Sequence, residues 1–323
     1  MELTSKKRLE LYAGRSHPAL AEDIADHLGV KLGHANLREF PISEVHCQFG
    51  ESVRGADIFI LQTHARRVND SIMEQLIMID AAKRASAKRI TAVCPYFGYS
   101  RQDRKASGRE PITAKLVADL LGTAGADRIV SVDLHSSQIQ GFFNGPVDHL
   151  TAMPVLLDHL RSTGPEDPVV VAPDAGRIKV AERLSQHLGC DLAFVYKRRP
   201  KGSVARVEAL DVIGNVAGRS CVVIDDMIDT ASTICAAADL LAERGASEVM
   251  VMATHGVLSE PAIDRLKNCA LSRVVVTDTL PVPDEKRFDC LEVLSVSGII
   301  ADAIDAVFED TSVSEIFGGD NQA

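Results

Sequence analysis

The stretch VVIDDMIDTASTI, residues 222–234, indicates the fold of this chain more clearly than any other. An apolar run ends in two adjacent acids, Asp225 and Asp226, and a turn rich in hydroxyl groups then enters a predicted helix at about residues 232–244. We interpret this order as a buried strand, a ligand-binding turn and a helix. Units of this kind are the building blocks of α/β proteins.

The same stretch has the residue types of a sugar-phosphate site. Two acids at the carboxyl end of a strand can accept hydrogen bonds from vicinal hydroxyls of a ribose, or hold a cation on them. Thr230, Ser232 and Thr233 supply hydroxyl donors. The first N–H groups of the helix, together with its dipole, favour a phosphate. Acids before a helix are also common as simple N-caps, so this stretch alone leaves the structural interpretation open.

Length and composition set the broad class of the protein. The chain has 323 residues, of which 46% are apolar and 25% charged, and this is long enough for two domains of about 150 residues. A formal charge of −10 argues against nucleic acid or a membrane as the main partner, because both need a basic face. The seven cysteines are scattered, which suits reduced thiols. The charged start predicts neither a signal peptide nor a membrane span, so we expect a cytoplasmic protein.

Short runs rich in Val and Ile alternate with amphipathic stretches of helical period. Continuous apolar runs between helices indicate parallel strands that are covered on both faces, which predicts an α/β fold. The expected strands are residues 57–61, 90–94, 128–133, 169–172, 191–195, 221–224, 249–253 and 274–277, and the expected helices are residues 18–28, 69–85, 112–123, 178–187, 231–244 and 261–268.

The two halves of the chain repeat one another, and this predicts a duplicated domain. The segments ASAKRITAV and RIVSVD in the first half correspond to GASEVMVMA and RVVVTD in the second. Chance likeness between α/β units is the alternative. The first half has QTHARRVND where the second has the acidic turn, so only the second is expected to hold a sugar phosphate. The join is expected near residues 151–167, where prolines and Gly164 cluster, and the tail from about Glu292 has one more strand and helix.

A second motif, PYFGYSRQDRKASGREPITAKLVADLL, occupies residues 95–121. It begins where a predicted strand ends and carries Arg101, Arg104, Lys105 and Arg109 before an amphipathic helix. Arginines packed this densely suit a polyanion, because guanidinium groups form bidentate contacts with phosphate oxygens. A solvated charged loop is the plain alternative.

These motifs resemble those of the ribose-phosphate diphosphokinase family over almost the whole chain. The resemblance includes RIVSVDLHSSQIQGFF, VAPDAG, KRRP, DDMIDTAST, ATHGVLS and TSVSEIF. Residues 222–234 resemble the phosphoribosyl-diphosphate loop of the type I phosphoribosyltransferase fold. The implied architecture is two tandem domains of that α/β fold, each a mostly parallel sheet flanked by helices. The first would span residues 1–153, possibly joined by the tail 292–323, and the second residues 154–291.

The resemblance also implies an activity. Members of the family transfer the diphosphate of ATP to the 1-hydroxyl of ribose 5-phosphate, which gives 5-phosphoribosyl 1-diphosphate and AMP for nucleotide biosynthesis. They use Mg²⁺, assemble as homo-hexamers and respond to ADP and phosphate. A phosphoribosyltransferase and a non-catalytic associated regulatory subunit are the alternatives. A repressor built on the same fold would need a basic helix-turn-helix, which the sequence does not show.

Carried over residue by residue, the resemblance assigns a role to each motif. His135 and Asp174 would bind magnesium, and Lys197 and Arg199 would supply positive charge to the transition state. ATP binding would fall to Phe40, Ile42, Ser43, Glu44, Arg101, Gln102 and Asp103, and ribose 5-phosphate binding to Arg199, Asp225, Asp226, Asp229, Thr230, Ala231, Ser232 and Thr233.

The chain departs from the family pattern in the loop expected to bind adenine. Ile42 and Ser43 stand where members usually have Asp-Gly or Asn-Gly. The side chain of Ile42 can form no hydrogen bond to a base, and Ser43 adopts positive φ less readily than glycine. Backbone groups and stacking on Phe40 are therefore the expected means of holding the base. Ser232 also replaces a usual glycine, and its hydroxyl can add a phosphate contact.

Overall fold

The computed structural model describes residues 7–65, 67–197 and 210–317, without the side chains of Lys197 and Leu210. Within these ranges the chain forms two compact units. Unit 1 takes the described residues up to Thr151, Thr279–Pro281 and those from Ser295 onward, and unit 2 takes Ala152–Asp278 and Val282–Leu294. No helix among the described residues combines the length and the apolar character that crossing a membrane requires.

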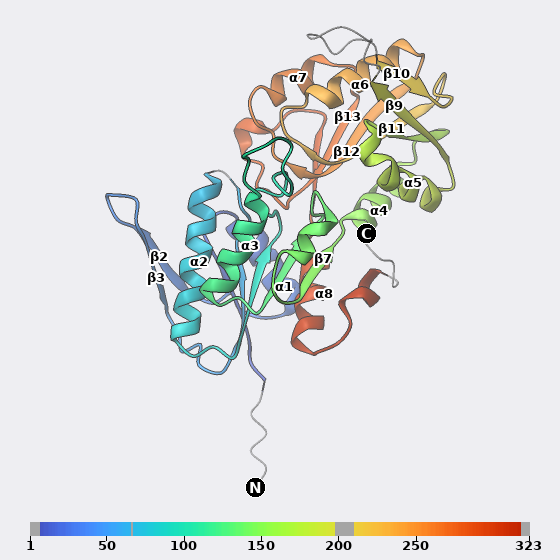
Figure 1. Cartoon of the computed structure of the whole chain (residues 1–323). Coiled ribbons are helices and arrows are strands. Elements are labelled where there is room, and N and C mark those ends of the chain that lie inside the picture. Colours follow the sequence, from blue (N-terminus) through green and yellow to red (C-terminus); the bar gives the residue numbers. More distant parts are fainter. Residues whose placement is uncertain (1–6, 66, 198–209, 318–323) are drawn as a thin grey trace. The chain divides into compact units, whose positions relative to one another are not determined.

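A five-stranded parallel sheet forms the centre of unit 1 (Figure 1). In spatial order it contains β1 (Leu9–Ala13), β4 (Asp57–Leu61), β5 (Arg89–Cys94), β6 (Arg128–Val132) and β7 (Val147–Leu150). Its helices are α1 (Pro18–Leu28), α2 (Val68–Arg84), α3 (Thr113–Ala124) and α8 (Ser297–Phe308). Ile58 and Ile60 of β4 share an apolar cluster with Met78 of α2 and Val117 of α3. Because neighbouring strand residues face opposite ways, Phe59 turns to the other face of the sheet.

A two-stranded antiparallel hairpin stands apart from this sheet. It consists of β2 (Ala35–Glu39) and β3 (Val45–Phe49), and it projects from unit 1 (Figure 1). The hairpin was not predicted, because its strands alternate half-buried and exposed residues and lack a continuous apolar run. Its tip carries residues 40–44, the expected adenine loop.

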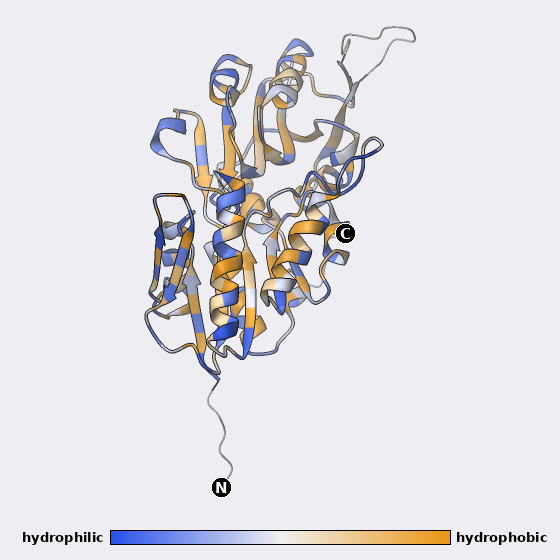
Figure 2. Cartoon of the chain, turned by 60° about the vertical axis from the view of Figure 1, so that its left-hand side comes forward, coloured by the Kyte–Doolittle hydropathy of each residue, from blue (hydrophilic) through white to orange (hydrophobic). Residues whose placement is uncertain are grey.

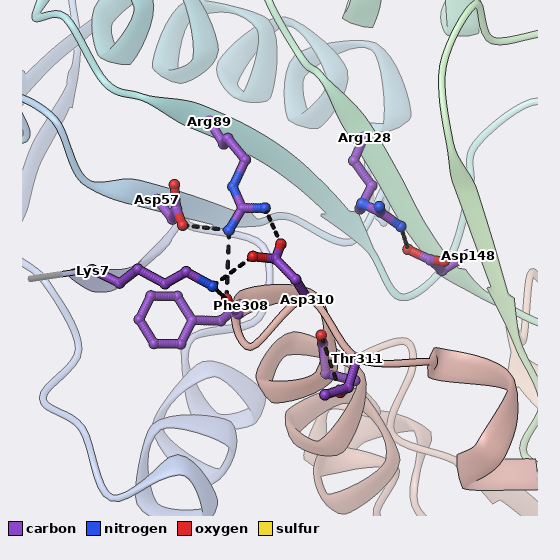
Figure 3. Close-up of polar contacts among 9 residues, drawn as sticks. Lys7, Asp57, Arg89, Arg128, Asp148, Phe308, Asp310 and Thr311 are labelled. Carbon is purple, nitrogen blue, oxygen red and sulfur yellow. Dashed lines mark hydrogen bonds and ion pairs between the residues drawn. The ribbon is translucent and has the colours of Figure 1, made fainter.

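The C-terminal segment of the described chain belongs to unit 1 and is held there by charge. Asp310, just after α8, accepts hydrogen bonds from Lys7 and from Arg89 of β5 (Figure 3). Arg89 also pairs with the buried carboxylate of Asp57 on β4. Lys7 and then Arg89 lower the pKa of Asp310 to about 2. Asp310 therefore joins the tail to Lys7, before β1, and to Arg89 of β5 in the same unit.

Unit 2 is built on a seven-stranded sheet. In spatial order it contains β10 (Leu210–Ile213), β9 (Asp191–Lys197), β8 (Pro168–Ala172), β11 (Ser220–Ile228), β12 (Glu248–Gly256), β13 (Arg273–Thr277) and β14 (Leu291–Leu294), and only β10 runs antiparallel to its neighbour. The helices are α4 (Met153–Thr163), α5 (Ile178–Leu188), α6 (Ser232–Glu243) and α7 (Ala262–Asn268). Val223 of β11 packs in the cluster of α6 and α7, whereas Val222 packs in that of α4 and α5. In Figure 2 the strands carry much of the hydrophobic colour.

The strand orders confirm the predicted duplication. Unit 1 has the order β1, β4, β5, β6, β7, and unit 2 repeats it as β8, β11, β12, β13, β14. In each unit the second and third strands of the chain fall outside this common set: β2 and β3 form the separate hairpin, and β9 and β10 extend the sheet beyond β8. The strand β11 and helix α6 of unit 2 therefore correspond to β4 and α2 of unit 1.

The segment expected to join the halves is largely helical. Pro154 lies in the first turn of α4, where its missing N–H is tolerated, and Gly164 ends the helix in the left-handed conformation at φ 56°. The boundary between the two units falls after Thr151, at the start of this segment, and Pro154 and Gly164 mark the two ends of a helix within it. The eight predicted strands and six predicted helices are all present, with bounds shifted by a few residues.

Candidate active site

The sequence predicts that the two acids of the opening motif stand at the carboxyl end of a strand that covers residues 221–224. In the structure β11 continues to Ile228, so both acids lie within the strand. β11 pairs with β8 only as far as Val223, opposite Val171, but it continues beside β12 as far as Ile228. Asp225 and Asp226 therefore lie in the part of β11 that extends beyond its pairing with β8. That vacated edge is where a side chain from the loop after β8 can approach the acids.

Arg177 fills this position, and its role was not predicted. It ends a single 3-10 turn, Ala175–Arg177, that follows β8. Its Nε lies 2.9 Å from Asp225 Oδ1, and its terminal nitrogen Nη2 lies 2.7 Å from Asp226 Oδ1. The side chains of Arg177, Asp225 and Asp226 are only 14%, 15% and 8% exposed. No local sequence signal identifies this contact, because it depends on β8 and β11 being neighbours in the sheet.

Burial and charge act in opposite directions on the acid pair. Burial raises the pKa of Asp225 above its ordinary value, and the adjacent Asp226 raises it further. The positive charge of Arg177 lowers it. The backbone N–H of Asp226 also donates to Asp225 Oδ1 at 2.8 Å, which favours the ionised form. The net effect is a raised pKa for Asp225, so the charge of Arg177 offsets burial and the neighbouring acid only in part.

The turn after β11 presents the N-terminus of α6. Ala231 precedes the helix in the left-handed conformation, at φ 61°, and the described residues place no side-chain cap on this end. The carbonyl of Thr230 accepts from Arg265 at 2.8 Å, and the carbonyl of Asp229 accepts from the backbone N–H of Ser259 at 3.0 Å. The turn is therefore held by hydrogen bonds from Arg265 and Ser259, which lie outside it in the sequence. The helix begins at Ser232, as predicted, and its first N–H groups lie beside the Ser232 and Thr233 hydroxyls at the end where a helix dipole favours an anion.

In unit 1, Arg101 and Gln102 line a cavity of about 800 Å³ at the start of α2. The other lining residues are Arg67, Val68, Asn69, Asp70, Tyr96, Tyr99 and Ser100. The side chain of Gln102 is fixed by the Thr113 hydroxyl at 2.6 Å, and its backbone N–H donates to the carbonyl of Tyr99 at 2.8 Å. Asp103 does not line the cavity and accepts instead from Gln138.

The hairpin tip holds the other expected nucleotide residues, Phe40, Ile42, Ser43 and Glu44, and none of them lines this cavity. Phe40 and Ile42 are 41% and 75% exposed. The Phe40 ring lies under the Arg38 guanidinium at 5.4 Å. Ser43 has φ 68°, the conformation for which the family pattern has glycine, so the departure seen in the sequence falls on a strained residue.

The two expected metal ligands belong to different units. His135, in unit 1, precedes the 3-10 turn Ser137–Gly141 and is half-buried. Asp174, in unit 2, follows β8 and accepts from the backbone N–H of Gly176 at 2.8 Å. No group of three or more His, Cys, Asp or Glu residues that could hold a metal ion occurs in the described part of the chain. The Lys197 side chain and all of Arg199 lie outside it.

Two units with the same strand order, and a strand-turn-helix motif that presents acids and an anion-binding helix end, define a protein of the phosphoribosyltransferase-type α/β class. Residues 9–125 match the family model described as the N-terminal domain of ribose phosphate pyrophosphokinase, and residues 194–318 match the one described as the phosphoribosyl synthetase-associated domain. The chain belongs to the ribose-phosphate pyrophosphokinase family.

Similar proteins cover nearly the full chain. A ribose-phosphate pyrophosphokinase of Bifidobacterium longum is 58% identical over 96% of this chain and 93% of its own length. One of Mycobacterium tuberculosis is 53% identical over 98% of each. The crystal structure of phosphoribosylpyrophosphate synthetase from Mycobacterium smegmatis matches with a TM-score of 0.89 and 52% identity, and covers 94% of this chain and all of that one. These relatives are enzymes, and neither a phosphoribosyltransferase nor a non-catalytic subunit is favoured.

Proposed function

We propose that this chain transfers the diphosphate of ATP to ribose 5-phosphate. The sugar's 1-hydroxyl oxygen bonds to the β-phosphorus of ATP, and the bond from that phosphorus to the oxygen bridging to the α-phosphorus breaks. The products are 5-phosphoribosyl 1-diphosphate and AMP, and the hydroxyl proton is released. The observation that carries the proposal is the buried acid pair of β11 next to the N-terminus of α6, in a chain of this family.

Unit 2 is proposed to bind the ribose 5-phosphate. Its phosphate takes the backbone N–H groups and hydroxyls of residues 229–233, where the α6 dipole favours negative charge. Its vicinal hydroxyls donate to Asp225 and Asp226. Binding at both ends holds the sugar in one orientation, which converts a collision between two substrates into a positioned reaction.

Unit 1 is proposed to bind ATP. Arg101 can form bidentate contacts with phosphate oxygens in the cavity at the start of α2, and Gln102 offers an amide. The half-exposed ring of Phe40 offers a stacking surface for adenine. Ser43, Glu44 and Asp103 are further proposed contacts, whereas the Ile42 side chain can contribute only apolar contact.

Magnesium is the proposed cofactor, with Asp174 and His135 as candidate ligands. A single carboxylate such as that of Asp174 fits Mg²⁺, which proteins usually bind through one or two carboxylates together with substrate phosphates and water. When bound, the ion supplies positive charge to the phosphate oxygens. The positive charges of Lys197, Arg199 and Arg101 are proposed to stabilise phosphate oxygens, because a loose transition state needs charge stabilisation more than covalent help.

The remaining expectations from the family are also proposals. These are a cytoplasmic location, assembly into a homo-hexamer, and control by ADP and phosphate.

AMP release tests the proposed function. We expect AMP only when ATP, ribose 5-phosphate and Mg²⁺ are all present, and GTP or ADP in place of ATP defines the nucleotide preference. Asp225→Asn should raise the KM for ribose 5-phosphate by at least about tenfold, since a hydrogen bond to a charged group contributes about 1.5–3 kcal/mol. Asp158→Asn, at an exposed site on α4, is the control. AMP release that needs no sugar, or an unchanged KM in the Asp225 variant, would contradict the proposal.

A further inference from the structure

Arg177 engages the two acids through one edge of its guanidinium group. Nε contacts Asp225 and Nη2 contacts Asp226, and each acid uses its Oδ1. These two nitrogens lie side by side in a rigid plane. The contacts therefore set the two carboxylates at a fixed spacing from one another. A carboxylate has two oxygens and about four acceptor positions, so each acid retains capacity for a further donor.

The negative charges of the two acids also favour the contact with Arg177. Asp225 and Asp226 are adjacent and shielded from water, where the repulsion between like charges is only weakly screened. The positive charge of Arg177 opposes the rise in the pKa of Asp225 that burial and Asp226 cause. Its two contacts hold one oxygen of each acid in place. Neighbouring acceptors at constant spacing are what a pair of vicinal hydroxyls requires.

We propose that Arg177 is a positioning residue that makes this site selective for sugar phosphates with two vicinal hydroxyls. The inference rests on the proposed function, and it assigns a role to a residue outside the turn that binds the phosphate. Arg177 acts through the acids and not by touching the reacting atoms. Its loss should impair recognition of the diol and leave recognition of the phosphate intact.

Arg219 offers a matched control at the opposite end of the same strand. It directly precedes β11 and donates to Asp167 at 2.9 and 3.0 Å and to Asp191 at 2.7 Å. Its side chain is 10% exposed, close to the value for Arg177. Both arginines therefore hold two carboxylates beside one strand, but only Arg177 does so at the proposed sugar site.

The test is calorimetric binding of ribose 5-phosphate and of 2-deoxyribose 5-phosphate to the full chain. The wild type should prefer ribose 5-phosphate by more than about tenfold, because the analogue leaves a buried charged acceptor without its donor. Arg177→Met should bring the ratio of the two dissociation constants to within about threefold. It should also raise the KM for ribose 5-phosphate and leave that for ATP unchanged. Arg177→Lys, which keeps the charge but not the planar fork, should give an intermediate ratio.

Arg219→Met should keep the wild-type ratio even if it destabilises the fold. Equal loss of selectivity in the Arg177→Met and Arg219→Met variants would show a general structural effect and overturn the inference. Full selectivity in Arg177→Met, or in Arg177→Lys if the methionine variant does not fold, would also overturn it. A wild type that binds no ribose 5-phosphate would contradict the proposed function as well, so the two failures are distinguishable.

Discussion

Arg67 and Ala231 occupy matching positions in the two units, and both have a positive, left-handed φ. Arg67 precedes α2 at φ 63°, and Ala231 precedes α6 at φ 61°. Each lies in the turn that follows the second strand of the common order, β4 or β11. The residue before the helix therefore has a left-handed φ in both units, whereas the acids that follow Ile224 in unit 2 correspond to a stretch beginning with Gln62 and Thr63 in unit 1.

This divergence predicts that each chain binds one ribose 5-phosphate. Unit 1 has a helix N-terminus after the corresponding strand but lacks the two acids that are proposed to recognise a diol. Titration calorimetry of the sugar phosphate into the protein should give a stoichiometry of one per chain. The double variant Asp225→Asn, Asp226→Asn should abolish that binding event. Two equivalent sites per chain would contradict the divergence argued from the turns.

The stability of the protein should fall in mild acid because of His64. This histidine is fully buried, its Nδ1 accepts from the backbone N–H of Gly98 at 2.9 Å, and its Nε2 lies 2.9 Å from Gln75 Oε1. Burial lowers the pKa of His64 to about 4, although Gln75 opposes the shift. The unfolded chain takes up the proton near pH 6.5 but the folded chain does not, so the free energy of unfolding decreases as pH falls from 6.5 toward 4.

The expected decrease is roughly 1.5 kcal/mol between pH 6.5 and 5, because the slope reaches 1.36 kcal/mol per unit of pH only below the unfolded-state pKa. Urea unfolding followed across this range should show it. His64→Gln should remove most of this dependence, whereas His187→Gln, at an exposed site on α5, should preserve it. The same slope in wild type and in the His64 variant would assign the effect to other groups.

The sequence predicted the central strands well because they carry continuous apolar runs. β4 reads Asp-Ile-Phe-Ile-Leu and is buried throughout. β7 and β10, which were missed, are edge strands of four residues, Val-Asp-His-Leu and Leu-Asp-Val-Ile. Short strands at a sheet edge pack on fewer neighbours, so polar residues interrupt their pattern. The segment Met153–Thr163 was assigned to a join because proline and glycine also mark helix ends.

The sequence also predicted the acid pair and the turn before α6, because both are local. The role of Arg177 was missed because its contact with Asp225 requires β8 to lie beside β11. The spacing of residues in the sequence does not indicate that these two strands are neighbours. The strain at Ser43 could be anticipated from the family pattern, and the structure gives it positive φ. The roles of Lys197 and Arg199 stay predictions from the family.

Phe40 is expected to bind the base of ATP by stacking. Phe40→Ala should raise the KM for ATP by at least about tenfold, because stacking of a base on an aromatic ring contributes about 1–3 kcal/mol. The KM for ribose 5-phosphate should stay constant in the same steady-state measurements. Ile42→Ala, two residues away and 75% exposed, should change the KM for ATP by less than about twofold if the base is held by stacking. A larger effect at Ile42 than at Phe40 would refute this role.

Lys197 is expected to act on the transition state. Removing one preorganised charge of this kind raises the barrier by roughly 3–4 kcal/mol, so Lys197→Ala should lower kcat about a hundred- to a thousandfold while ribose 5-phosphate binding is spared. Lys179→Ala, at an exposed site on α5 of the same unit, should keep normal turnover. A Lys197 variant that retains more than about a tenth of the rate would rule out the role, since a tenfold change is only 1.36 kcal/mol.

The central claim is that this chain moves a diphosphate and not a single phosphate group. Phosphorus NMR of a reaction with ATP, ribose 5-phosphate and Mg²⁺ tests it most directly, because the products of the two reactions have different resonances. We predict equal amounts of AMP and a sugar that carries a diphosphate at carbon 1. ADP together with a singly phosphorylated carbon 1, or no sugar-dependent change in ATP, would contradict the account.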